Sequence, residues 1–380
     1  MRQRITRAVL GGMVAVGALA MAPASVSAAQ PACGDSLTTS TTLTADLDCS
    51  GYNGTALYMG HNGVVLNLNG HTIWGYTGDD SNSGVDTDGY DNTKVTNGTI
   101  ANFGYGVYMV QSGSTKLTQL DIVGEAADTG DYGVYQDYGA GNRVANSDIS
   151  GVQYGIYSQY ASNLQVLNNT IDADYIGVET YYDSRDRFEN NVVTADSYGF
   201  YDDYSGNLVY VGNRSNGGDY GWYLDCSSYG KVTLKNNVAN NNSDYGFYLY
   251  ECYGSNTSYA PGTGSKITGN TANNNGTGFY DYYSINSVWT SNVAHDNDDD
   301  GFYLEYPGGV DLTYNKANRN GDTGFELSEN YSSGYYNVYR ISWNTANQNS
   351  YGFYAAYGAP GKGNVANNNS SDNCYNVRCN

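Results

Sequence analysis

The sequence predicts an all-β fold, a single parallel β-solenoid of roughly 14 coils with a repeat of about 22 residues. Three observations predict it: a recurring aromatic-Gly-apolar-Tyr motif, apolar residues at alternate positions that run into asparagine, and an unusual composition. The 380 residues include 49 Gly and 41 Tyr, but only 14% are charged. Disordered chains combine high charge with few aromatic residues, so this composition indicates a folded chain.

The glycine motif sets the length of the repeat. The commonest separation between successive glycines is 22 residues, and longer separations are interpreted as insertions into that unit. The motif is complete around Gly106, Gly133, Gly155, Gly199, Gly221, Gly246 and Gly352, with weaker copies around Gly177, Gly278, Gly301 and Gly324.

The residues ahead of each glycine predict short strands and turns. In the stretch from Val232 to Asn237, for example, apolar residues alternate with polar ones and end at two asparagines, a pattern typical of strands and not of helices. One coil cannot bury its apolar side alone, but coils stacked about 4.8 Å apart share a core. A β-propeller blade would need roughly 40 residues. An asparagine nine residues before the glycine predicts a ladder of Asn146, Asn168, Asn190, Asn237, Asn292 and Asn315.

Residues 1–29 have the three-part plan of a secretory signal: Arg2, Arg4 and Arg7, then an apolar run, then small residues up to Ala29. The run is shorter than the roughly 20 residues of a membrane span. We therefore expect a secreted β-helix domain over 30–380. The signal carries three basic and no acidic residues, so its removal changes the net charge from −21 to −24. Such an acidic chain disfavours nucleic acid and anionic membranes as partners, and we expect a monomer.

Six cysteines in an exported chain indicate disulfides. Fifteen pairings are open in principle. Clustering along the chain favours Cys33 with Cys49, Cys226 with Cys252, and Cys374 with Cys379. Neighbouring coils would bring Cys226 and Cys252 within disulfide range, and the last pair would close a C-terminal end at 365–380.

The glycine and asparagine repeats, with the opening segment from Gly63 to Ile73, resemble the right-handed parallel β-helix repeat family. This is the pectate-lyase-like superfamily, which includes the NosD-like repeat domains. The resemblance covers nearly all of the mature chain and implies a right-handed helix. It also implies an N-terminal cap at 30–50 pinned by its disulfide. The superfamily contains lyases, hydrolases, epimerases and adhesins, so the fold alone leaves the activity open.

A column of tyrosines is expected to face the solvent. If the residue after each glycine points into the core, the residue two after it points outward. Stacked tyrosines stabilise a sheet through cross-strand pairs, and a strip of exposed rings also suits sugar rings of an extracellular polysaccharide. The expected substrate-binding residues are Tyr157, Tyr201, Tyr223, Tyr248, Tyr280 and Tyr303.

The charged residues favour glycoside hydrolysis over a lyase reaction. A polyuronate lyase needs cations beside its substrate, but Arg143, Arg187, Lys266 and Arg340 share one column with no two on neighbouring coils. The epimerase pattern implied by the resemblance is only half matched from Tyr198 to Asp203, which lacks its Pro-His, and the polygalacturonase set is not assembled.

Paired carboxylates suit glycoside hydrolysis, and stacked like charges raise one pKa, as a general acid requires. The predicted catalytic residues are therefore Glu179, Asp203 and Asp225. Solvated surface acids and a cation site are the alternatives for these three carboxylates.

An acidic run after His295 gives a candidate calcium site. Asp296, Asp298 and Asp300 would supply oxygen ligands, although the run does not match an EF-hand loop. The loop at 256–265 is a candidate lid over one end of the face. The sequence thus predicts a secreted polysaccharide-binding protein, with hydrolase activity favoured over lyase activity. A noncatalytic adhesin or structural protein is the alternative.

Overall fold

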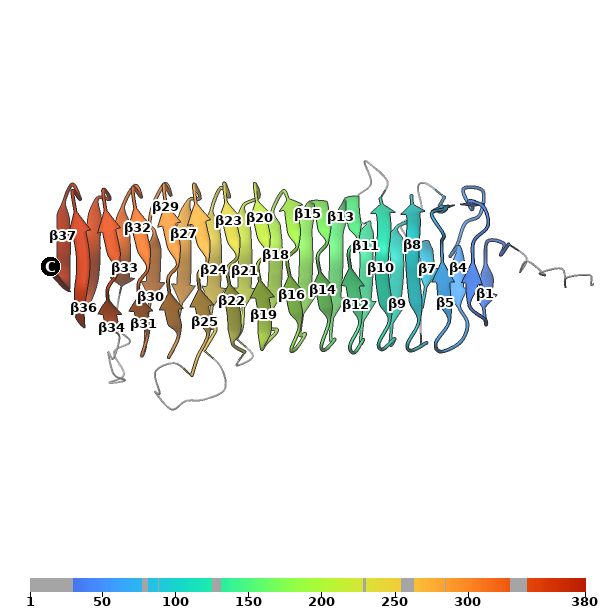
Figure 1. Ribbon diagram of the computed structural model, residues 1–380, viewed down its shortest axis with the longest axis horizontal. Coiled ribbons are helices and arrows are strands. Elements are labelled where there is room, and N and C mark those ends of the chain that lie inside the picture. Colours follow the sequence, from blue (N-terminus) through green and yellow to red (C-terminus); the bar gives the residue numbers. More distant parts are fainter. Residues whose placement is uncertain are drawn as a thin grey trace, which may run out of the picture.

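The computed structural model describes residues 30–76, 81–87, 89–124, 131–227, 230–253, 263–283, 285–328 and 340–380. These residues form 37 strands, all in one parallel solenoid of about 13 turns (Figure 1). The all-β solenoid is confirmed, and the number of turns is close to the expected 14. The expected signal segment at 1–29 and residues 256–262 of the candidate lid lie outside the described residues. No helix in the described ranges has the length and hydropathy of a membrane span.

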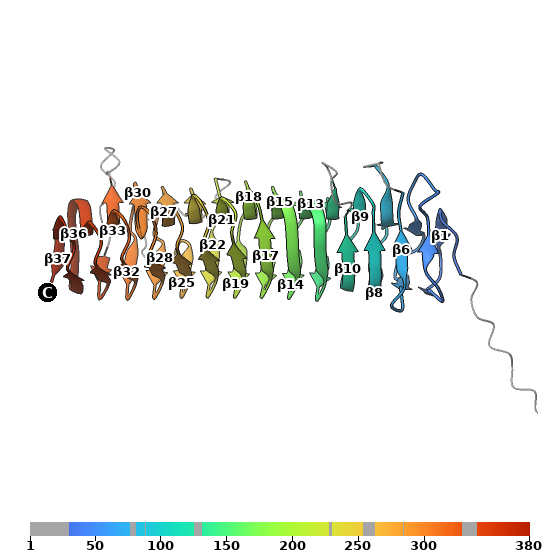
Figure 2. The ribbon, with the colours of Figure 1, turned by 90° about the horizontal axis from the view of Figure 1, so that it is seen from above.

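Each coil contributes strands to three faces, and each strand pairs in parallel with its counterpart on the next coil (Figure 2). The first face contains β1 (Asp35–Leu37), β4 (Leu57–Met59), β7 (Ser83–Asp86), β9 (Tyr105–Val110), β11 (Tyr132–Asp137), β13 (Asp148–Gln159), β15 (Thr170–Tyr181), β18 (Tyr198–Asp203), β21 (Tyr220–Asp225), β24 (Tyr245–Tyr250), β27 (Thr277–Tyr282), β30 (Phe302–Glu305), β33 (Thr323–Ser328), β36 (Tyr351–Asn367) and β37 (Asp372–Cys379). The second contains β2 (Thr41–Thr42), β5 (Val65–Asn67), β8 (Lys94–Ala101), β10 (Lys116–Val123), β12 (Arg143–Ala145), β14 (Gln165–Leu167), β16 (Arg187–Glu189), β19 (Leu208–Val211), β22 (Val232–Lys235), β25 (Lys266–Thr268), β28 (Val288–Thr290), β31 (Asp311–Thr313) and β34 (Arg340–Ser342). The third contains β3 (Leu47–Asp48), β6 (Thr72–Trp74), β17 (Val192–Ala195), β20 (Arg214–Asn216), β23 (Val238–Asn240), β26 (Thr271–Asn273), β29 (Val293–His295), β32 (Lys316–Asn318) and β35 (Thr345–Asn347), together with parts of β8, β10, β13, β15 and β36.

The segment 30–50, which was expected to form a cap, already contains the first coil of the solenoid. Strands β1, β2 and β3 already pair in parallel with β4, β5 and β6. The structure joins the cysteines as Cys33–Cys49, Cys226–Cys252 and Cys374–Cys379, the pairs that their clustering favoured. The first and last bonds therefore lie at the two ends of the described stack, and the middle one joins neighbouring coils.

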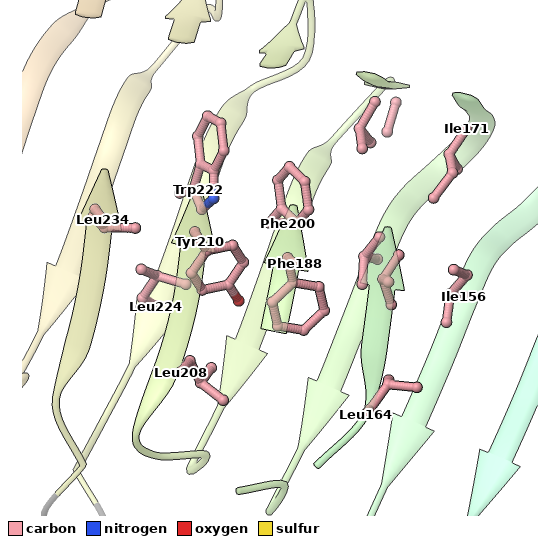
Figure 3. Close-up of a cluster of buried hydrophobic side chains, with 14 of the residues drawn as sticks. Ile156, Leu164, Ile171, Phe188, Phe200, Leu208, Tyr210, Trp222, Leu224 and Leu234 are labelled. Atoms are coloured by element: carbon pink, nitrogen blue, oxygen red, sulfur yellow. The ribbon is translucent and has the colours of Figure 1, made fainter. Parts of the chain in front are cut away.

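The core is a set of side-chain columns that run along the solenoid axis. The residue after each motif glycine is fully buried, as expected, and becomes aromatic from Phe200 onward. Phe200 stacks on Trp222 with ring centroids 4.8 Å apart (Figure 3). Trp222 stacks in turn on Phe247 at 4.6 Å. Phe188 and Tyr210 form a second stacked pair beside them. The column continues through Phe279, Phe302, Phe325 and Phe353.

The motif glycine is required by close packing of the first and third faces. A Cβ at Gly199 would lie 1.8 Å from Oγ of Ser215 on β20 and 2.8 Å from the carbonyl oxygen of Gly221 on the next coil. Any larger residue would have to displace either a side chain of the opposite face or the adjoining backbone. The recurring glycine thus marks the point where the chain enters the first face, on each coil from Gly106 to Gly352.

Buried asparagines form a ladder at the corner between the second and third faces. From Asn191 onward, each amide accepts hydrogen bonds from the backbone N–H and Nδ2 of the asparagine one coil earlier, as Asn191 does from Asn169 at 3.0 Å each. Its own Nδ2 donates to a carbonyl of the earlier coil, here that of Val166. The ladder contains Asn169, Asn191, Asn213, Asn237, Asn270, Asn292, Asn315, Asn344 and Asn364.

The expected composition of this ladder was partly wrong. Asn237, Asn292 and Asn315 belong to it, but Asn146, Asn168 and Asn190 precede it by one residue and have left-handed backbones, with φ between 52° and 55°. The cause is an extra residue in the later coils: the ladder asparagine lies eight residues before Gly199 and nine before Gly246. A fixed count back from the glycine therefore selects two different columns.

Asn292→Asp is expected to lower the free energy of unfolding by about 3 to 5 kcal/mol at neutral pH. Asn292 Nδ2 donates to the Ile267 carbonyl and to Asn315 Oδ1, and aspartate would turn these donors into a buried negative charge. The measurement is urea denaturation followed by circular dichroism. Asn241→Asp, at an exposed left-handed position, is the matched control and should change stability by less than about 0.5 kcal/mol. Equal effects of the two substitutions would contradict the role of the ladder.

Candidate functional site

The outward side of strands β9 to β36 on the first face forms the tyrosine face. Its central ladder consists of the residues two after each glycine: Tyr108, Tyr135, Tyr157, Glu179, Tyr201, Tyr223, Tyr248, Tyr280, Tyr303, Glu326 and Tyr354. All of them are half-buried. A second row, which the sequence reasoning missed, lies one residue before the glycine and includes Tyr132, Tyr154, Tyr198, Tyr220 and Tyr245. The aromatic residue that opens the aromatic-Gly-apolar-Tyr motif was the sequence signal for this second row.

The tyrosine rings stack on one another along the axis. Tyr223 and Tyr248 have centroids 4.9 Å apart and planes within 5°, and Tyr201 stacks on Tyr223 in the same way. The second row packs edge-on against the first, as Tyr220 does against Tyr223 at 78°. Neighbouring rings therefore cover each other's faces, and the ladder presents mainly ring edges and hydroxyl groups. The expected flat platform for sugar rings is thus not formed by most of the predicted binding tyrosines.

The stacking changes at two of the predicted tyrosines. Tyr157 stacks on Tyr135 on one side only, because Glu179 occupies the next position. Tyr303 packs edge-on against Tyr280 at 72°. Glu179 pairs in register with Tyr157 and Tyr201. On that side, each of these two rings therefore has the Glu179 side chain as its neighbour instead of another tyrosine ring.

Glu179 is the titratable group at this break in the ladder. Burial between the two tyrosine-bearing strands, with the negative charge of Asp203 nearby, raises the pKa of Glu179 to about 7. A carboxyl with this pKa is partly protonated at neutral pH and is able to give up its proton in a reaction. Burial and the nearby carboxylates also raise the pKa of Tyr201, so its hydroxyl keeps its proton.

Asp203 lies on the coil after Glu179, and Asp225 lies one coil further along the same face. They are Cα partners on neighbouring coils, four residues after their glycines. Burial and the charge of Asp225 raise the pKa of Asp203. Asp225 accepts a hydrogen bond from the backbone N–H of Ser227 at 2.8 Å. Asp203 is two residues beyond Tyr201, the register partner of Glu179, which puts the Cα atoms of Glu179 and Asp203 on a diagonal of roughly 7 to 8 Å.

A second set of carboxyl groups lies inside the solenoid, where the sequence reasoning did not expect them. Asp202 accepts from the Thr180 hydroxyl at 2.9 Å, Asp183 from the backbone N–H of Ala161 at 2.6 Å and from the Ser158 hydroxyl, and Asp186 from the N–H of Leu164 at 2.8 Å. Burial raises the pKa of all three, to about 6 for Asp183. Period-two alternation predicts an inward Asp202 once Phe200 is known to point inward.

The candidate calcium ligands are not brought together. Asp296 accepts two hydrogen bonds of 2.7 Å from Arg319, which lowers its pKa. Asp300 accepts from the backbone N–H of Thr323 at 2.7 Å, and burial raises its pKa to about 7. Asp298 is exposed. Within the described ranges, no group of three or more His, Cys, Asp or Glu side chains is arranged to hold a metal ion.

Basic side chains are more clustered than expected, but away from these carboxylates. Arg143 and Arg187 are separated by Gln165, as predicted. The same column, however, continues through Lys116, which pairs with Arg143, and Lys94, which pairs with Lys116, so three basic residues lie on consecutive coils of the second face. Strands β9 to β33 of the first face contain no lysine or arginine. A lyase-type cation beside Glu179 is therefore absent from those strands.

Comparisons with known proteins identify the architecture. The family model described as right handed beta helix region matches residues 44–171, 125–259 and 252–378. A search of curated protein sequences found no match.

Solved structures with the same architecture share little sequence with this chain. The mannuronan C-5 epimerase AlgE4 A-module of Azotobacter vinelandii matches with a TM-score of 0.53 and 14% identity, over 90% of this chain and 91% of that one. The periplasmic alginate epimerase AlgG matches at 0.53 and 12%, over 83% and 78%. The catalytic unit of the GH87 alpha-1,3-glucanase from Streptomyces thermodiastaticus matches at 0.54 and 15%, over 83% of this chain but only 64% of the glucanase. At these identities the likeness establishes the fold alone.

Proposed function

The chain belongs to the right-handed β-helix family, and from this premise we propose that it is a secreted protein that binds an extracellular polysaccharide along its tyrosine face and hydrolyses it at Glu179, Asp203 and Asp225. The observation that carries the proposal is the Glu179 carboxyl, whose pKa is about 7. This group lies at the break in the tyrosine ladder, with Asp203 on the next coil and Asp225 on the coil after that. The solved structures with this fold include alginate epimerases and an alpha-1,3-glucanase, which are polysaccharide-acting proteins.

The roles follow from the protonation states. Glu179 is the general acid, because it is the group that holds a proton near neutral pH. Asp203 or Asp225 is the carboxylate that acts as base or nucleophile. Tyr157 and Tyr201 flank Glu179, so a sugar ring placed over it would meet two ring surfaces that no third tyrosine covers on that side.

The charge of the face favours a neutral polysaccharide. A uronate polymer would place carboxylates against Glu179, Asp203 and Asp225, and no lysine or arginine on β9 to β33 would offset that repulsion. A lyase or epimerase reaction also needs positive charge to stabilise the intermediate formed on a uronate. Hydrolysis of a neutral glycan needs no such charge.

The test is incubation of the purified protein with neutral and acidic polysaccharides, with and without calcium, while reducing ends and ultraviolet absorbance are followed. We expect new reducing ends from a neutral polymer without any rise in absorbance. A rise in absorbance would indicate an unsaturated sugar and a lyase, and would contradict the charge argument. Retention on a polymer without turnover would make the chain a binding module instead.

Tyrosine hydroxyls are expected to contribute to glycan binding more than tyrosine faces do. The double substitution Tyr201→Phe/Tyr223→Phe keeps the stacked rings but removes two hydroxyls, and should weaken binding roughly tenfold. Affinity electrophoresis in gels that contain the glycan measures this change. Tyr108→Phe, at the far N-terminal part of the same ladder, is the control. A double variant that binds like the unaltered protein would contradict a hydroxyl contribution.

A further inference from the structure

Two aromatic residues occupy turn positions that are filled by small or polar residues on other coils. Tyr314 and Trp343 have φ angles of 59° and 61° at the corner between the second and third faces. They lie on neighbouring coils, directly after the register partners Thr313 and Ser342. A left-handed backbone is uncommon for bulky residues. In this chain it also occurs at Tyr138, Tyr160, Tyr182 and Tyr204, but the rings of those four stack on one another, unlike those of Tyr314 and Trp343. The same column on earlier coils holds Asn146, Asn168, Asn190, Gly212, Asn236, Gly269 and Ser291.

The indole of Trp343 lies flat against the backbone of the next coil. A Cβ at Gly363 would be 2.2 Å from Cε3 and 2.4 Å from Cζ3 of Trp343, so the ring fills the space above this glycine. Lys362 Nζ lies 6.0 Å from the ring centroid. The residue is nevertheless 47% exposed. Part of the ring covers Gly363 and Lys362 Nζ lies over the ring, so the exposed area belongs to the rest of the side chain.

This arrangement differs from the tyrosine face. Tyr314 is 58% exposed, and no ring contact joins it to Trp343 or to any other aromatic residue of the described ranges. The rings of the central ladder, by contrast, cover each other at about 5 Å. The corner thus offers open aromatic surface on two consecutive coils, at a place where both the backbone strain and the exposure of apolar rings count against folding.

We propose that Trp343 and Tyr314 form a carbohydrate-binding site that is separate from the tyrosine face. A pyranose ring presents a flat array of C–H bonds, and these bonds pack favourably against the electron-rich face of an aromatic ring. Lys362, whose Nζ lies 6.0 Å from the centroid of the Trp343 ring, and the exposed Lys316, two residues after Tyr314 in the chain, supply hydrogen-bond donors for the sugar hydroxyls. The ligand class is a glycan chain with pyranose units, either neutral or uronate.

The site does not depend on catalysis at Glu179. Along each coil the corner follows the second face and precedes the third, whereas Glu179 lies in the middle of the first face on β15. Binding at the corner therefore holds the protein on an insoluble polymer while the tyrosine face engages another chain or another stretch of the same chain. Two linked sites raise the retention on a polymer without any change in either individual affinity.

Tryptophan fluorescence tests the proposal directly. The chain has four tryptophans, of which Trp222 and Trp289 are buried while Trp74 and Trp343 are exposed. In a Trp74→Phe variant, Trp343 is therefore the exposed reporter. Soluble neutral glucan, galactomannan, pectate and alginate should be added in turn while quenching by acrylamide is followed. We expect at least one of them to lower the quenching constant by about half, and the polymer that does so identifies whether the ligand is neutral or a uronate.

Binding variants complete the test. Trp343→Ala and Tyr314→Ala should each reduce retardation in a gel that contains that polymer at least fivefold, while Trp343→Phe keeps part of it and Trp74→Ala leaves it unchanged. Tyr201→Phe/Tyr223→Phe should leave the protection of Trp343 intact, which separates this site from the tyrosine face. Thermal melting of every variant identifies loss of fold. No protection of Trp343 by any polymer, or equal retardation of Trp343→Ala and the unaltered protein, would overturn the proposal.

Discussion

Raising the pH from 4 to 8 is expected to lower the melting temperature of the protein by roughly 10 °C. The folded chain holds several carboxyl groups in surroundings that favour the protonated form. Burial raises the pKa of Glu179 and of Asp300 to about 7, and that of Asp183 to about 6. In the unfolded chain the same groups titrate near pH 4.

The sign of the effect follows from this difference. A carboxyl group with a raised pKa in the folded state contributes its full stabilisation below about pH 4, and loses it as the pH rises through the folded pKa values near 6 and 7. A shift of 2 to 3 units corresponds to about 3 to 4 kcal/mol for one group, so the three groups together cost the folded state on the order of 10 kcal/mol at pH 8. Asp186 and Asp202, whose pKa values are also raised by burial, act in the same direction. Asp296 acts in the opposite direction, because Arg319 lowers its pKa.

Melting curves followed by circular dichroism between pH 4 and 8 measure the effect. Asp202→Asn is the informative variant, because an amide oxygen still accepts from Thr180 while the ionisable group is removed. It should raise the melting temperature at pH 8 and change it little at pH 4. Asp174→Asn, an exposed substitution on β15, should leave the pH dependence as it is. A protein that is equally stable at both pH values would contradict this account.

Glu179→Gln is expected to reduce the hydrolytic kcat by about 10² to 10⁴, with a small effect on KM. Glutamine fills the same space between Tyr157 and Tyr201 but cannot transfer a proton to the leaving group. For the same reason, kcat of the unaltered enzyme should fall as the pH rises above about 7, where Glu179 loses its proton. The measurement is the rate of reducing-end release across this pH range.

Glu326→Gln is the matched control for that substitution. Glu326 is the other carboxyl group of the central ladder, with Tyr303 and Tyr354 as its register partners. Its neighbouring carboxyl groups, Asp300 and Asp322, precede the motif glycine, and the column that holds Asp203 and Asp225 near Glu179 holds Ser328 and Ala356 near Glu326. We expect this variant to retain turnover. Equal losses of activity in the two variants would indicate that both carboxyl groups of the ladder stabilise the fold. Full activity of Glu179→Gln would show that Glu179 takes no part in the reaction.

Much of the architecture could be predicted from the sequence because the repeat is governed by local rules. A glycine at a site of close packing, followed by an inward apolar residue such as Phe302, recurs once per coil and gives both the period and the inward direction. The three disulfide pairs followed from the proximity of residues on the same or neighbouring coils. Alternation also placed Asp203 and Asp225 in one outward column.

The features that were missed depend on geometry beyond alternation. Period two predicts that Tyr223 points outward, but not that its ring plane lies parallel to that of Tyr248, since this depends on side-chain rotation and on the neighbouring rings. The carboxyls at Asp183 and Asp186 fall in a turn after β15, where alternation no longer applies. Likewise, Trp343 lies at a corner whose left-handed backbone has no signature in its own residue type.

The strict pairing of each strand with its counterpart one coil away has a consequence for how the chain folds. Nearly all register partners are 20 to 33 residues apart, so every coil completes its contacts with its two nearest neighbours. Folding can then start at any well-packed coil and spread to the next, with each finished coil acting as a template for the strand edges that follow. The stacked phenylalanines from Phe247 to Phe353 form the most uniform block of core. We expect this block to protect its backbone amides from hydrogen exchange first, and protection to spread from it towards both ends.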